Sequence, residues 1–149
     1  MAVFGVPIPR TSRAGISRDA INAVASALAM EDRLKELNEQ WRRLGKPTAR
    51  MRIGIFTGPV IAGGLGPADR LSYTVIGDTV NTASRLESTR DPGLDLAEVG
   101  ICRTLVGETT AEHLGAMFVL REVGTIALKG KENPLRVLQV LGWSQTTAV

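Results

Sequence analysis

The 149-residue sequence contains one cysteine, Cys102, and no apolar run long enough to cross a lipid bilayer. A single cysteine excludes a disulfide within the chain and suits a reducing compartment. The opening residues, MAVFGVPIPR, lack the basic segment and long apolar core of a secretory signal peptide. We therefore expect a cytoplasmic protein without a membrane segment of its own.

The excess of positive charge is also small, because 18 Lys and Arg residues against 15 Asp and Glu residues give a net charge of +3. This excess is too small to indicate a nucleic-acid partner. One basic stretch lies between Arg42 and Arg52, with Trp41 as the adjacent aromatic residue. We interpret the stretch as a solvated helix end and expect no nucleic-acid partner, although a basic nucleic-acid module stays as the weakest alternative.

With 44% apolar and 22% charged residues, the chain has the composition and length of one globular domain, residues 1–149. An apolar stripe from Ala20 to Leu44 predicts a long amphipathic helix that Ser17 caps. Strands are predicted at MAVFG, MRIGIFTG, LSYTVIG and GICRTLV, with a glycine-rich connection over residues 59–70. ETTAEHLG predicts a short helix. Strand-like segments on both sides of KENP predict an antiparallel hairpin, so the fold class is α+β.

Several residue types that often carry chemistry are better explained by structure. The glycines between Gly58 and Gly66 are not followed by Gly-Lys-Ser/Thr, so they form no P-loop and indicate turns or close packing. His113 has no cysteine or histidine nearby and is expected at the surface. Cys102 has no evident activating base and is expected in the core. We expect no metal site from these residues.

The segment SYTVIGDTVNTASRLEST is the most informative part of the chain. It predicts a strand that ends at Gly77, followed by a helix from Asp78, as its cap, to about residue 88. We expect Val80, Ala83 and Leu86 to face the core. Asn81 and Arg85 then share a different face, because residues four apart are neighbours on a helix.

An exposed helical arginine is common, but Arg85 has an amide rather than a carboxylate at the position four residues before it. An amide beside a guanidinium can bind a polar anionic ligand. Lys129 and Lys131 alternate with glycine in ALKGKENP, which favours either close approach of a ligand or simply a turn.

The run YTVIGDTVNTASRLES resembles the signature of class III nucleotidyl cyclases, the adenylate and guanylate cyclase catalytic domains. RIGIFTGPVIAGGLG resembles the preceding strand and glycine-rich segment of that family, and VGTIALKGKENPLRVLQVL resembles its closing hairpin. MAVFGVPIP is similar to the strand after the family's second metal-binding aspartate. The resemblance covers essentially the whole chain and implies a ferredoxin-like fold, with a mostly antiparallel sheet and flanking helices.

The resemblance also implies a role for each matching residue. Asn81 orients the ribose, Arg85 meets the α-phosphate in the transition state and Lys129 contacts the terminal phosphates. Thr74 reads the purine. The implied reaction is attack of the ribose 3′-hydroxyl of ATP on the α-phosphate, which yields cyclic AMP and releases pyrophosphate. Threonine offers both a donor and an acceptor, so guanylate cyclase activity is an alternative.

The family uses two divalent ions, Mg²⁺ or Mn²⁺, held by two aspartates that precede the segment matched by MAVFG. The resemblance thus implies an N-terminally truncated domain that binds no metal specifically and is inactive alone. Family sites form between two subunits, which implies a homodimer or larger assembly and leaves room for regulatory domains in a longer parent protein. A non-catalytic cyclase-like module for dimerisation or nucleotide binding is the main alternative.

Overall fold

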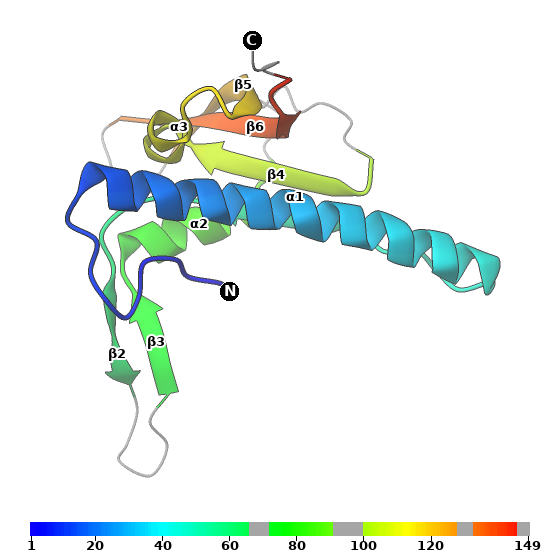
Figure 1. The fold of residues 1–149 in the computed structure, drawn as a ribbon, viewed down its shortest axis with the longest axis horizontal. Coiled ribbons are helices and arrows are strands. Elements are labelled where there is room, and N and C mark those ends of the chain that lie inside the picture. The colour runs from blue at the N-terminus through cyan, green and yellow to red at the C-terminus, as the bar shows by residue number, and fades with distance from the viewer. Residues whose placement is uncertain (66–71, 91–99, 128–132, 146–149) are drawn as a thin grey trace.

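The computed structural model describes residues 1–65, 72–90, 100–127 and 133–145, which form three helices and two sheets (Figure 1). The helices are α1 (Arg13–Arg43), α2 (Asp78–Ser88) and α3 (Glu108–Leu114). The strands are β1 (Met51–Ile55), β2 (Ile61–Leu65), β3 (Ser72–Ile76), β4 (Cys102–Gly107), β5 (Phe118–Ile126) and β6 (Leu135–Trp143). This mixture of elements confirms the α+β class.

The larger sheet has the strand order β1-β4-β6-β5. β1 pairs with β4 in parallel, whereas β4 with β6 and β5 with β6 are antiparallel. The predicted closing hairpin and the mostly antiparallel sheet are therefore confirmed. β2 and β3 form a separate antiparallel pair that projects away from the larger sheet (Figure 1). The prediction of a connection over residues 59–70 is wrong at residues 61–65, because this stretch pairs along β3.

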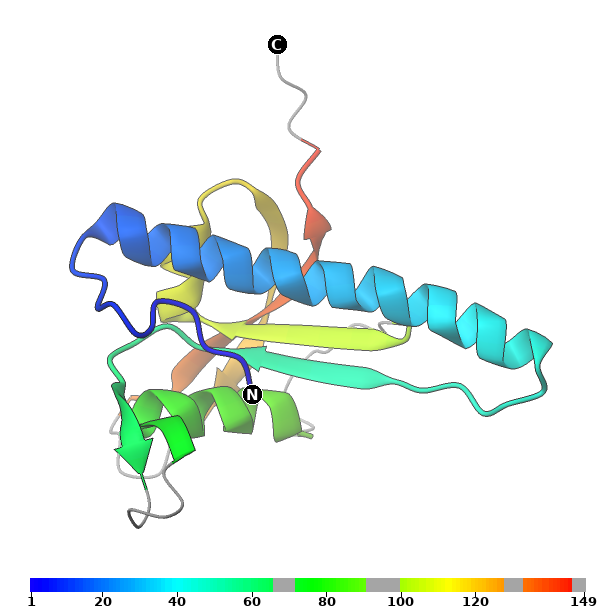
Figure 2. The same ribbon diagram turned by 60° about the horizontal axis from the view of Figure 1, so that its bottom comes forward.

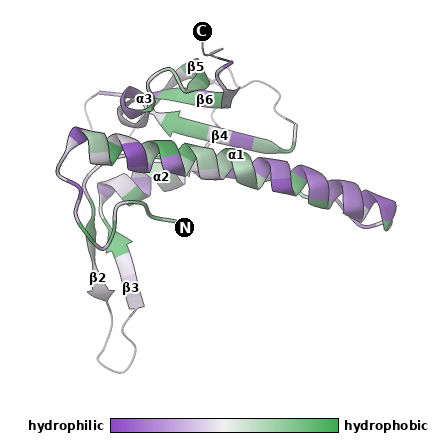
Figure 3. Ribbon diagram, in the orientation of Figure 1, coloured by the Kyte–Doolittle hydropathy of each residue, from purple (hydrophilic) through white to green (hydrophobic). Residues whose placement is uncertain are grey.

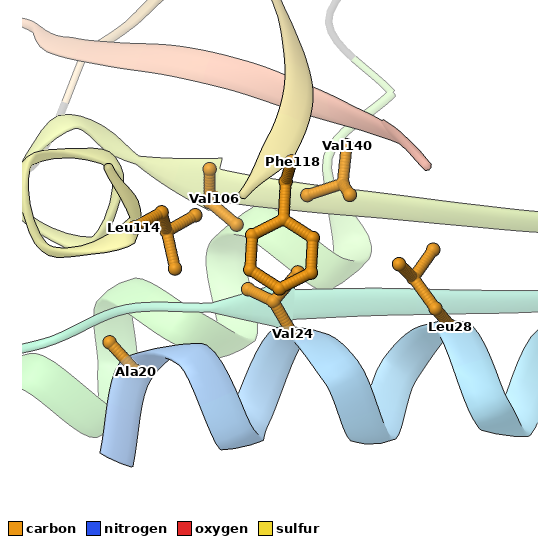
Figure 4. Close-up of a cluster of buried hydrophobic side chains, with 7 residues drawn as sticks. All are labelled: Ala20, Val24, Leu28, Val106, Leu114, Phe118 and Val140. Carbon is orange, nitrogen blue, oxygen red and sulfur yellow. The ribbon is translucent and has the colours of Figure 1, made fainter. Parts of the chain in front are cut away.

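Helices cover both faces of the larger sheet, with α1 and α3 on one face and α2 on the other (Figure 2). Successive side chains of a strand point to opposite faces, so β4 sends Leu105 and Val106 into different clusters. Leu105 packs with Leu86 of α2. Val106 packs against α1 and α3 in a second cluster, whose seven buried members are Ala20, Val24, Leu28, Val106, Leu114, Phe118 and Val140 (Figure 4).

α1 is the long amphipathic helix that the apolar stripe predicts, but its cap is Ser12 rather than Ser17. The Ser12 hydroxyl accepts a hydrogen bond from the Gly15 amide at 3.1 Å. The polar second half of α1 extends past the sheet (Figure 3). No helix within the described ranges combines the length and apolarity that a membrane span needs.

Two further details of the α1 region differ from the sequence-based expectation or could not be expected from it. MAVFG forms no strand, and residues 1–12 lead into α1 without regular structure. Asn38 is buried near the end of α1, where its amide donates to the Ala49 carbonyl and accepts from the Ala49 amide, both at 2.8 Å. This reciprocal pair fixes the path of the chain from α1 to β1.

Candidate active site

The turn from β3 into α2 sets the position of the candidate residues. Gly77 occupies it with φ of 142°, a conformation that side chains other than hydrogen disfavour. The amides of Val80 and Asn81 donate to the Gly77 carbonyl at 3.1 and 3.3 Å and begin the helix. Gly77 is the N-cap and α2 has no side-chain cap bond. The prediction of Asp78 as the cap is therefore wrong.

The buried face of α2 consists of Thr79, Thr82 and Leu86. The Thr79 hydroxyl donates to the Pro59 carbonyl at 2.7 Å, and the Thr82 hydroxyl donates to the Asp78 carbonyl at 2.9 Å. These bonds satisfy the hydroxyls locally and allow threonines to be buried. Leu86 is buried, as expected, but Val80 and Ala83 are only half-buried, and Thr79 and Thr82 take the other buried positions of α2.

Asn81 and Arg85 are both exposed on the other side of α2. Arg85 forms no ion pair with any residue in the described ranges. It lines an open pocket of about 280 Å³ together with Ser88, Thr89, Ile126 and Ala127. An unpaired guanidinium at a pocket can bind a phosphate or carboxylate through paired N–H groups.

The pocket brings the end of α2 next to the end of β5, although the two are far apart in the sequence. Ala127 directly precedes residues 128–132. Lys129 and Lys131 lie in that stretch and are outside the described residues, so the structure does not place them. The structure does show that Ile126 and Ala127, which precede this stretch, line the same pocket as Arg85.

Thr74 is half-buried on β3, opposite Gly63 of β2. Side chains alternate along strands, and directly opposed residues point to the same face, so Thr74 shares a face with Ile61 and Ile76. Both isoleucines are exposed, and a Cβ at Gly63 would meet nothing within 4 Å. Thr74 therefore lies on an uncovered face of the β2–β3 pair, and Gly77 connects β3 to α2.

The remaining candidates behave mostly as structural residues. Cys102 is buried, as predicted, and burial raises the pKa of its thiol. His113 is not a free surface residue: it is half-buried, and its Nδ1 lies 2.9 Å from the Ser17 hydroxyl, which joins α3 to α1. Across the described ranges, no three His, Cys, Asp or Glu side chains come together in a group that could hold a metal ion.

Two residues that contact α2 are missing from the sequence-based list. Gly54 of β1 lies directly beneath the backbone of α2. Arg103 of β4 donates from Nη2 to the carbonyls of Glu87 and Thr89, at 3.2 and 2.7 Å. The one signal in the sequence is an arginine inside the otherwise apolar and small GICRTLV strand, and that signal does not identify its partners.

Comparison with known proteins gives a family. The model for the adenylate and guanylate cyclase catalytic domain matches residues 1–140. Adenylate cyclase 1 of Rhizobium meliloti is 36% identical over 142 residues, which are 95% of this chain and 19% of that protein. The adenylate cyclase of Mycobacterium tuberculosis strain H37Rv is 39% identical over 132 residues, 88% of this chain and 25% of that protein.

Solved structures agree with the sequence relatives. The adenylyl cyclase CyaB from P. aeruginosa superposes with a TM-score of 0.78 at 33% identity, covering 97% of this chain and 68% of that one. The guanylyl cyclase Cya2 gives a TM-score of 0.72 at 30% identity, covering 98% and 66%. The chain thus spans a quarter or less of the curated relatives and about two thirds of the solved domains. It belongs to the adenylate and guanylate cyclase catalytic domain family, the class III nucleotidyl cyclases.

Proposed function

We propose that this chain is the catalytic-domain portion of an adenylate cyclase, which converts ATP into 3′,5′-cyclic AMP and pyrophosphate. The observation that carries the proposal is the position of Arg85, which is exposed, unpaired among the described residues and part of a pocket at the end of β5. The family match over residues 1–140 supports treating residues 1–149 as one partial catalytic domain.

In the proposed reaction the ribose 3′-hydroxyl attacks the α-phosphate. Negative charge increases on the phosphoryl oxygens, so the Arg85 guanidinium stabilises the transition state more than the bound substrate. Asn81 acts by orienting the ribose with its amide. Lys129 binds the terminal phosphates and Thr74 contacts the purine. The structure supports this assignment for Arg85 and Asn81 through their shared exposed side of α2.

Members of this family generally use divalent metal ions, which neutralise phosphate charge and activate the attacking hydroxyl. Among the described residues, no three His, Cys, Asp or Glu side chains form a group that could hold a metal ion. We therefore assign no step through a metal to this chain.

Two alternatives lead to different measurements. Thr74 offers a donor and an acceptor and permits guanine as well as adenine, and the guanylyl cyclase Cya2 is structurally similar. ATP is favoured because adenylate cyclases are the relatives at 36% and 39% identity. A non-catalytic dimerisation module would assemble with a cyclase subunit without contributing to catalysis.

We also propose that the chain acts in the cytoplasm as a homodimer or larger assembly. A site shared by two subunits would place Asn81 and Arg85 of this chain opposite the metal-binding residues of a complete cyclase subunit. The exposed isoleucines beside Thr74 are suited to such an interface.

Complementation of a disabled cyclase tests the function. The 149-residue chain is mixed with a complete subunit of an adenylate cyclase that carries alanine in place of its own motif asparagine and arginine. The mixed dimer should then form cyclic AMP from ATP, and Arg85→Ala in this chain should lower that activity about 100-fold or more. Formation of the mixed dimer without any cyclic AMP would favour the non-catalytic module, and a preference for GTP would favour a guanylate cyclase.

A further inference from the structure

Arg103 binds the end of the helix that carries the proposed catalytic arginine. Its Nη2 donates to the carbonyl oxygens of Glu87 at 3.2 Å and of Thr89 at 2.7 Å. Carbonyls in the last turn of a helix have no partner within the helix, and the helix dipole favours a cation there. Arg103 therefore caps the C-terminal end of α2 from a neighbouring strand.

The capped turn is also the wall of the pocket. The Thr89 amide donates to the Arg85 carbonyl at 2.9 Å, so the residue that Arg103 holds is bonded directly to the backbone of Arg85. Arg85, Ser88 and Thr89 are three of the five described residues that line the pocket. A shift of this turn would displace the Arg85 side chain relative to Ile126 and Ala127 on the opposite wall.

The backbone of Arg103 is held in the sheet. It lies on β4, an inner strand of the larger sheet, between the buried residues Cys102 and Thr104. Its neighbour in register on β1 is Arg52. Burial lowers the pKa of the Arg103 guanidinium and Arg52 lowers it further, but an arginine remains charged at neutral pH. A cation held in this setting is oriented by the two carbonyls it binds.

We infer that Arg103 is a positioning residue, which holds the last turn of α2 so that the Arg85 guanidinium remains aimed into the pocket. The inference rests on the proposed function, because that function makes Arg85 the group that meets the α-phosphate. Arg103 does not touch substrate in this role. It acts through the backbone of Thr89, and its effect on the reaction passes through Arg85.

Kinetics of the mixed dimer test the inference. Arg103→Met keeps most of the side-chain volume and removes the donors, and should lower kcat about 10- to 100-fold while KM for ATP stays within about twofold. Arg103→Lys keeps a cation with donors and should restore kcat to within about threefold of the native chain. A rise in KM with unchanged kcat would overturn the inference.

A double substitution checks that Arg103 acts through Arg85. In the Arg85→Ala chain, adding Arg103→Met should change kcat by less than about twofold, because the group that it positions is already gone. Full multiplication of the two effects would contradict the inference. Arg52→Met is the matched control, because Arg52 contacts the Glu87 side chain at 3.4 Å rather than a backbone carbonyl of α2. The kcat of this variant should stay within about twofold of the native value.

Amide hydrogen exchange on the 149-residue chain gives a readout that needs no activity. Arg103→Met should accelerate exchange of the Thr89 amide about 10-fold or more and leave β6 amides unchanged. Equal acceleration in β6 would indicate general destabilisation. Unchanged exchange at Thr89 would show that Arg103 does not hold the last turn of α2. Either result overturns the inference. If the native chain shows no activity in the mixed dimer while Arg103→Met accelerates exchange of the Thr89 amide, the proposed function fails. In that case the contact by which Arg103 holds the last turn of α2 is still confirmed.

Discussion

Gly54 of β1 and Ala83 of α2 are in direct backbone contact. A Cβ added at Gly54 would overlap the Ala83 carbonyl oxygen and the Glu87 amide nitrogen, and would lie 2.9 Å from the Cβ of Leu86. The helix therefore lies on the strand at a separation that only hydrogen at position 54 permits. Leu86 is completely buried at this contact, which fixes the height of Asn81 and Arg85 above the sheet.

The first prediction follows from that contact. Gly54→Ala should lower the free energy of unfolding by about 2–3 kcal/mol, because α2 must move away from β1 to admit the methyl group. Gly63→Ala is the matched control, since a Cβ there meets nothing within 4 Å and its change should stay within about 0.5 kcal/mol. Urea unfolding of the two variants measures the difference. Equal stabilities would show that the close contact does not constrain α2.

Local patterns in the sequence predict the helices well. The predicted stripe members Ala20, Val24 and Ala27 are buried on one face of α1, although Met30 is exposed. The Gly77 break before a periodic segment fits α2, which ends at Ser88. The exact caps are less accessible, because Ser12 and Ser17 both have a side chain suited to the role. Which of them caps α1 depends on where the preceding chain turns.

Non-local contacts explain what the sequence could not reveal. The spacing of Asn81 and Arg85 is local and predicts a shared face, whereas the pocket wall at Ile126 belongs to β5, a strand that pairs with β6. Arg103 is the clearest case. Its partners are backbone carbonyls, which have no sequence signature, and only the packing of α2 on β4 brings them within reach.

The second prediction separates the proposed roles of two residues on α2. In the mixed dimer, Arg85→Ala should lower kcat about 100- to 1,000-fold, corresponding to about 3–4 kcal/mol of lost transition-state stabilisation. Asn81→Ala should lower kcat by a smaller factor, about 10- to 100-fold, because it removes orientation rather than charge. Ser84→Ala on the exposed side of α2 is the control and should change little. Steady-state rates of cyclic AMP formation decide between these outcomes.

The third prediction concerns Cys102. The side chain is 2% exposed, and burial raises the pKa of its thiol above the ordinary value. Only the thiolate attacks disulfide reagents, so the folded chain should react with an aromatic disulfide at pH 8 much more slowly than the urea-unfolded chain. A cysteine introduced at the exposed position Ala29 serves as the internal reference and should react within the mixing period. Fast modification of Cys102 in the folded protein would contradict its core position.

The fourth prediction concerns pH and the exposed pair across β5 and β6. Arg136 Nη2 donates to Glu122 Oε2 at 2.6 Å, and this bond lowers the pKa of the Glu122 carboxyl below its usual range. A lowered folded-state pKa stabilises the fold above the ordinary glutamate pKa, and the contribution is lost as pH falls through the folded-state value. Arg136→Gln should return the titration of Glu122 to its ordinary range, as NMR of the carboxyl carbon would record. Arg18→Gln, at an exposed site on α1, should leave that titration unchanged.

The fifth prediction addresses assembly through the surface around Thr74. Ile61 and Ile76 oppose each other across β2 and β3 and are 70% and 46% exposed. Two adjacent isoleucines on a projecting sheet lose contact with water if another copy covers them, which favours association. We expect a dimer or larger species in sedimentation at high micromolar concentration, with Ile61→Lys shifting the distribution toward monomer.

Met30→Lys, on the 52% exposed side chain of α1, is the matched control and should leave the distribution as it is. A native chain that sediments as a clean monomer at that concentration would contradict the prediction. If both lysine variants dissociate the assembly equally, added charge rather than the β2–β3 surface is responsible.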